Sequence, residues 1–173
     1  MEGNEAVPPS LKQALIEELG ASGAWAEETL RGLPEAELAQ GRYENGWSGR
    51  QILAHVAAIE WTYPRLLDLA REAGGTEREA NGRVQASARG GMDEYNRRQV
   101  EKREGVPVSV LIDEMVRNRA ALIDAIEAAD DGLFDVPIRS AGGRTGTLAA
   151  VMREVAIDHV RGHVNDIVGI RPL

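Results

Sequence analysis

The chain contains three histidines, and their positions predict a metal site. His159 and His163 lie four residues apart, so on a helix both imidazoles would lie on the same face. His55 belongs to a different predicted helix and could bring a third nitrogen to the same ion. Three histidine ligands leave coordination positions open, as catalytic metal sites require and closed structural sites do not. The expected chemistry is activation of a bound water or thiol by a divalent ion.

The spacing of these histidines also has a structural interpretation. A lone histidine on an apolar helix face is more often a core residue that donates to a backbone carbonyl, and His-x-x-x-His alone is a weak motif. The chain has no His-Glu-x-x-His sequence, so the glutamate base of the zinc proteases is not expected. From spacing alone, metal ligation and a structural role both stay open.

Composition excludes several classes of function. The 173 residues include no cysteine, which excludes disulfides, thiolate metal cages and a cysteine nucleophile. Any thiol in the reaction must therefore come from a second molecule. The net charge of −8 works against nucleic-acid binding, because phosphate backbones are held mainly by clustered basic residues.

The length and the hydropathy of the chain indicate its organisation and location. A chain of 173 residues suits one domain with one substantial core, so residues 1–173 are expected to form a single domain. The N-terminal segment is acidic, and no apolar run approaches the roughly 18 residues of a membrane span. We therefore expect a soluble, cytoplasmic protein that does not contact membranes. The excess of arginine over lysine indicates a bacterial genome rich in G and C.

Hydrophobic periodicity predicts an all-α fold. Apolar residues recur every three to four positions in four long segments, and patterns with a period of two are nearly absent. Cap and stop residues place these helices at about 10–32, 48–75, 107–132 and 147–169. Pro64 should kink the second helix, and a polar crossover of residues 76–105 should contain a short helix near 93–103. Four such helices with one long crossover predict a four-helix bundle.

The apolar stripes of the helices predict where the imidazoles point. On the fourth helix, Leu148, Met152 and Val155 continue to His159 by steps of three and four, and His163 prolongs the row. On the second helix, His55 lies three residues after an isoleucine and four before another. All three rings are therefore expected inside the bundle.

Two segments of the chain resemble the DinB/YfiT-like superfamily. In that family a Trp-Ser pair opens helix two, a Leu-x-His follows, and a His-x-x-x-His or Glu-x-x-x-His lies on helix four. Residues 45–60 and 158–163 carry these features, with Trp47, Ser48 and Leu53-Ala54-His55 in the first segment. The resemblance implies a four-helix bundle, often a homodimer, that holds a divalent metal, most commonly nickel or zinc. It assigns the ligand role to His55, His159 and His163.

The resemblance also implies a class of reactions. Known members include isomerases and S-transferases that use a low-molecular-weight thiol, mycothiol or bacillithiol, as cosubstrate. We therefore expect a thiol transferase, isomerase or hydrolase that acts on a small electrophilic molecule. The chain ends at Leu173, directly after the fourth predicted helix, without the extra C-terminal domain of the mycothiol-dependent maleylpyruvate isomerases. The alternatives are a stress-related or ligand-binding bundle without metal, and a dimeric scaffold.

Three further residues are candidates for the surroundings of the metal. Asp166 follows His163 by three residues on the same face and could orient a ligand or bind the ion, although a solvated role is equally compatible. Tyr95 and Asn96 lie in the crossover and could cover the site and contact substrate. They belong to residues 93–98, which resemble an Asp-x-x-Asn feature of the family whose role the sequence does not assign.

The remaining features have structural interpretations. Trp47 resembles a hydrophobic staple that closes the start of the second helix. Trp25, Trp61 and Tyr63 are expected in the core or in dimer contacts. Glu60 should point away from His55, which lies five residues earlier. The glycine-rich residues 141–147 lack the lysine of a phosphate-binding loop and are expected to form a flexible loop.

Overall fold

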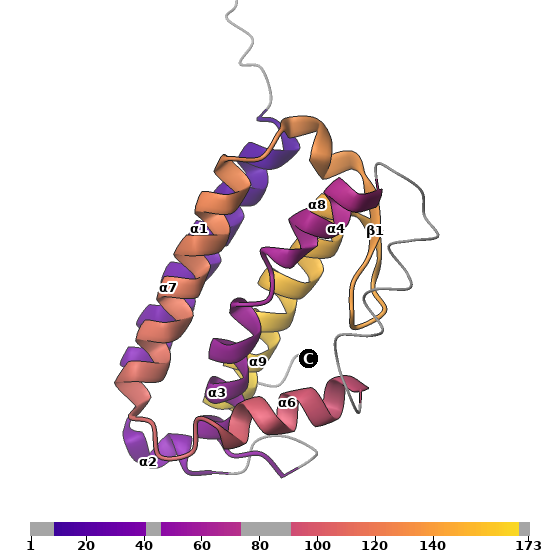
Figure 1. Ribbon diagram of the computed structural model, residues 1–173. Coiled ribbons are helices and arrows are strands. Elements are labelled where there is room, and N and C mark those ends of the chain that lie inside the picture. Colours follow the sequence, from indigo (N-terminus) through magenta and orange to yellow (C-terminus); the bar gives the residue numbers. More distant parts are fainter. Residues whose placement is uncertain (1–8, 41–45, 74–90, 170–173) are drawn as a thin grey trace, which may run out of the picture.

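The computed structural model, described for residues 9–40, 46–73 and 91–169, is an all-α bundle (Figure 1). Its four long parts run side by side: α1 (Leu11–Arg31), α3 (Gly49–Glu60) with α4 (Arg65–Ala73), α7 (Val108–Glu127), and α8 (Leu148–Met152) with α9 (His159–Val168). In the last part, α8 and α9 form one continuous helix through a π-helical segment at residues 153–158. The shorter elements are α2 (Glu35–Leu38), α6 (Gly91–Glu101), a 3₁₀ helix (Asp131–Asp135), β1 (Pro137–Arg139) and β2 (Thr145–Thr147). The predicted four-helix bundle is confirmed.

Side-chain caps fix where the helices begin. The Ser10 hydroxyl accepts the amide of Gln13 at the start of α1. At the start of α3, Ser48 and Gln51 form a reciprocal capping box, in which each side chain accepts the backbone amide of the other residue. At the other end of the chain, Gly169 ends α9 with a φ of 75°, a conformation that costs glycine little. The predicted starts at Ser10 and Ser48 and the predicted end at Gly169 are thus confirmed.

Two predictions about local structure are wrong. The second helix is broken rather than kinked, because α3 ends at Glu60 and α4 restarts at Arg65 after a turn that contains Pro64. Proline lacks the amide that would continue the ladder, and it disfavours a helical conformation in the preceding residue. Residues 141–147 are not simply a loop, since β2 pairs with β1 in an antiparallel hairpin. Strands of three residues are too short to show a period of two in the sequence.

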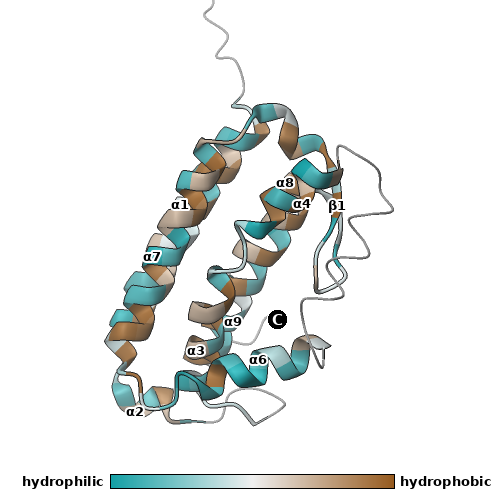
Figure 2. Ribbon diagram, in the orientation of Figure 1, coloured by the Kyte–Doolittle hydropathy of each residue, from teal (hydrophilic) through white to brown (hydrophobic). Residues whose placement is uncertain are grey.

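The core lies between the long helices. Figure 2 shows hydrophobic and hydrophilic residues interleaved along each of them, as amphipathic helices require. The largest fully buried side chains come from α1, α3, α4, α7, α8 and the 3₁₀ helix: Leu15, Leu19, Leu30, Ile52, Leu53, Leu67, Leu111, Leu122, Ile126, Leu148, Met152 and Phe134. Tyr63 is buried and Trp25 is half-buried against the core, whereas Trp61 is 71% exposed and lies outside it. The alternative place of Trp61, in dimer contacts, remains a prediction. Within the described residues, no helix is long and apolar enough to cross a membrane.

Candidate metal centre

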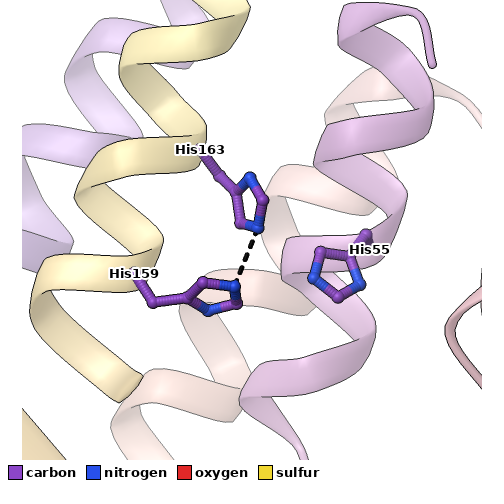
Figure 3. A group of neighbouring side chains, drawn as sticks. All are labelled: His55, His159 and His163. Carbon is purple, nitrogen blue, oxygen red and sulfur yellow. Dashed lines mark hydrogen bonds between the residues drawn. The ribbon is translucent and has the colours of Figure 1, made fainter. Parts of the chain in front are cut away.

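The three histidines meet at one point between two helices. Figure 3 shows His159 and His163 on α9 facing His55 on α3. One nitrogen from each ring lies within 4.8 Å of the other two, and the Nε2 atoms of His159 and His163 are 2.9 Å apart. Two nitrogens that bind one ion at about 2.1 Å are separated by roughly 3.0–3.4 Å. The nitrogens of His159 and His163 already lie near this separation, and any spacing near the 4.8 Å limit would have to shorten for all three to bind one ion.

The site is buried on one side and open on the other. His55 and His163 are 3% and 5% exposed, whereas the side chain of His159 is exposed. The expectation that all three rings lie inside is thus wrong for His159. A π-helical segment has more residues per turn than an α-helix, so the buried row continues through Ala156 and Val160 instead of Val155 and His159. This shift places His159 at the edge of the buried row. A metal ion bound there would keep one face open to solvent.

The environment keeps the imidazoles neutral. Burial, together with the nearby rings of His163 and His159, lowers the pKa of His55 to about 3. Burial also lowers the pKa of His163 to about 4. The pKa of His159 is about 4 because its ring is largely desolvated and lies beside His163, although part of the side chain is open to solvent. The neutral imidazole is the form that binds metals.

The donor set fits a divalent metal. Among the described residues, the buried Nδ1 of His55 has no hydrogen-bond partner. A buried polar atom without a partner costs free energy, and a shared cation is a partner that neutral imidazoles can take. The 2.9 Å contact between His159 and His163 requires a proton on one of its two nitrogens, and metal binding would displace that proton. Neutral nitrogen donors without a thiolate suit zinc or nickel.

The lowered histidine pKa values predict a pH-dependent stability of the metal-free protein. Because His55 and His163 have a pKa below 6.5 in the folded chain, the unfolded chain takes up their protons first as the pH falls. Their stabilisation is complete above about pH 6.5 and is lost toward pH 3–4, with a slope of up to about 1.4 kcal/mol per pH unit for each histidine. Urea unfolding between pH 7 and 5 measures this slope. His55→Leu should flatten it, and an unchanged slope would contradict the account.

Two neighbours of the histidines have defined contacts. The ring of Trp47 lies 5.6 Å from that of His55, centroid to centroid, and is tilted by 52°. This contact was missed because Trp47 precedes the helix and has no fixed position on its face. Asp166 Oδ2 lies 3.5 Å from His163 Nδ1, and partial burial raises the pKa of this carboxyl group. Asp166 thus lies beside His163, and its role in orienting a ligand or binding the ion remains a prediction.

Tyr95 and Asn96 lie on α6, which packs against α3. Both side chains are half-buried, and none of the described interactions joins them to a histidine. Their role in substrate contact remains a prediction. Within residues 93–98, Arg97 pairs with Glu94 and also with Glu101 on the surface of α6, which gives part of this segment a helix-stabilising role.

A buried ion pair joins α3 to α7 and was not predicted from the sequence. Glu60 points toward α7, where Arg119 Nε is 3.0 Å from both carboxylate oxygens and Arg119 Nη2 donates to Oε1. Burial raises the pKa of Glu60, and the guanidinium of Arg119 opposes this rise. The sequence held a signal, since Arg119 continues the buried row of Met115, Leu122 and Ile126. A charge within an apolar stripe indicates a buried partner.

Comparisons with known proteins agree with the fold and with the family resemblance. A family model described as the DinB superfamily matches residues 18–167. One similar solved structure is YfiT from Bacillus subtilis, titled a probable metal-dependent hydrolase with an unusual four-helix bundle topology, at 14% identity and a TM-score of 0.65. The alignment covers 98% of this chain and 91% of YfiT.

A mycothiol-dependent maleylpyruvate isomerase is similar at 16% identity and a TM-score of 0.65. The match covers 96% of this chain but only 63% of the isomerase. At these identities the likeness shows the fold. A search of curated proteins finds no match to this chain.

Proposed function

Because the chain belongs to the DinB superfamily and gathers its three histidines at one point, we propose that it is a metal-dependent enzyme. In this proposal His55, His159 and His163 bind one divalent ion, Ni²⁺ or Zn²⁺. The observation that carries it is the convergence of three neutral ring nitrogens within 4.8 Å, from helices more than a hundred residues apart in the chain. Mg²⁺ and Ca²⁺ fit less well, because they prefer oxygen ligands.

The proposed reaction uses water or a thiol cosubstrate against a small electrophilic molecule. When bound, a divalent ion supplies Lewis acidity, which lowers the pKa of a coordinated water or thiol toward neutrality. The chain has no cysteine, so a thiol would be supplied by the cosubstrate. Support comes from the similar structures, of which one is titled a probable metal-dependent hydrolase and another is mycothiol-dependent.

The chain's own residues would hold and orient the site. The exposed edge at His159 leaves an approach for substrate, while the buried His55 and His163 exclude water from the inner side. Asp166 would accept the Nδ1 proton of His163 and so leave Nε2 for the metal. The half-buried indole of Trp47 beside His55 would provide an apolar wall.

A metal-free ligand-binding or stress-related bundle is the second candidate. It is favoured by the hydrogen bond between His159 and His163, which satisfies two ring nitrogens without an ion. In that case chelator would change neither stability nor ligand binding. A homodimeric state and a cytoplasmic location remain predictions in either case, and sedimentation would test the first.

An assay with and without chelator separates the two candidates. Protein purified without chelator would be tested on a panel of small esters, epoxides and aryl halides, each with water alone or with mycothiol or bacillithiol. We expect turnover that disappears after dialysis against a chelator and returns with one equivalent of Ni²⁺ or Zn²⁺. Turnover that does not respond to chelator would contradict the proposed metal enzyme.

A further inference from the structure

The π-helical segment before His159 releases a backbone carbonyl from the helix. In an α-helix the amide of His159 would bond to the carbonyl of Val155, four residues earlier. Here it bonds to the carbonyl of Glu154, five residues earlier. The Val155 carbonyl therefore loses its usual donor and must find another partner, because an unpaired carbonyl at the edge of a core is costly.

The side chain of Tyr63 supplies that partner. The hydroxyl of Tyr63 donates to the Val155 carbonyl over 2.5 Å. Tyr63 is 3% exposed and lies in the turn between α3 and α4, so the core fixes the position of its hydroxyl.

The next carbonyl of the segment is also held from outside. Arg119 Nη2 donates to the carbonyl of Ala156 over 2.6 Å. Arg119 is itself held by Glu60 and by the Ser22 hydroxyl, which accepts from Nη1 over 3.3 Å. Two successive carbonyls of the π-helical segment thus bind side chains from α7 and from the α3–α4 turn. These contacts fix the rotation of the segment that ends at His159.

We propose that Tyr63 is a positioning residue for the metal ligand His159, acting through the carbonyl of Val155. This inference rests on the proposed metal-dependent function. The Val155 carbonyl lies one turn before His159, so the bond from Tyr63 fixes the rotation of the helix with which His159 Nε2 faces His163 Nε2. The loss of a residue that holds a metal ligand in position commonly lowers metal affinity 10- to 100-fold.

The test compares Tyr63→Phe with a matched control, Thr62→Val. The Thr62 hydroxyl also donates to a backbone carbonyl, that of Ile59 at 2.7 Å, but this carbonyl belongs to α3 and not to the π-helical segment. Titration with Ni²⁺ and with Zn²⁺ should show a Kd raised at least about 10-fold in Tyr63→Phe. In Thr62→Val the Kd should stay within about twofold of the wild type.

A second readout does not need metal. Because the contact between His159 Nε2 and His163 Nε2 holds the ring in one state, nitrogen NMR of the metal-free protein should show a single His159 tautomer in the wild type and in Thr62→Val. Tyr63→Phe should show a mixture of tautomers. The proposal is overturned if either the tautomer or the affinity of Tyr63→Phe stays at its wild-type value. If the wild type itself binds neither metal, the proposed function fails, and the tautomer alone decides whether Tyr63 positions His159.

Discussion

Replacing His159 with alanine should weaken the binding of Ni²⁺ or Zn²⁺ by more than about 100-fold. Losing a residue that only hydrogen-bonds to a metal ligand costs about 10- to 100-fold in affinity, and losing the ligand itself should cost more. The substitution removes one of the three converging nitrogens. Because His159 lies at the exposed edge of the buried row, its loss should leave little empty space in the core, and the stability of the metal-free protein should change little. Isothermal titration of both proteins, with circular dichroism for the fold, measures the two effects separately.

A control is needed because a chain with a net charge of −8 attracts cations without a specific site. Asp158→Ala removes an exposed carboxylate next to His159 and leaves the three imidazoles in place. We expect wild-type affinity in this variant. Equal losses in the two variants would show that metal binding follows surface charge, and the histidine site would then be rejected.

Arg119→Met should lower the free energy of unfolding by about 3–5 kcal/mol, the typical cost of removing one partner of a buried ion pair. Glu60 is fully buried and would lose its only described cationic partner. Part of this cost should disappear at lower pH, because a protonated Glu60 carries no charge to bury. Urea unfolding at pH 7 and at pH 5 measures both effects.

The double variant Arg119→Met with Glu60→Leu separates stability from positioning. Replacing a whole buried pair by apolar residues is often neutral or stabilising, so most of the lost stability should return. The contact from Arg119 to the Ala156 carbonyl would not return. We therefore expect a stable protein with weakened metal affinity. A double variant as unstable as Arg119→Met would show that the ion pair is not the source of the cost.

Local signals made most of the architecture predictable. Ser10, Ser48 and Gly169 set helix ends through contacts with residues three or four positions away, which sequence spacing records directly. The convergence of the histidines was predicted from stripes on two helices and from the family motif. These features depend on chemistry within one helix or on the general geometry of a bundle.

The missed features depend on contacts between elements. The π-helical segment rotates the end of the last helix, and it is held by Tyr63 and Arg119 from other helices. No pattern within residues 147–169 shows that the buried row changes from Val155 to Ala156. The Glu60–Arg119 pair likewise joins residues 59 positions apart. Periodicity predicts the face of a regular helix and fails where tertiary contacts change its register.

X-ray absorption at the metal edge, combined with metal analysis of protein purified without chelator, tests the central claim most directly. We predict about one divalent ion per chain with three imidazole nitrogens in its first shell, at about 2.0–2.1 Å for zinc. Loss of one nitrogen from that shell in His159→Ala would identify the site. A protein without stoichiometric metal after loading, or a shell of oxygen atoms alone, would contradict the account.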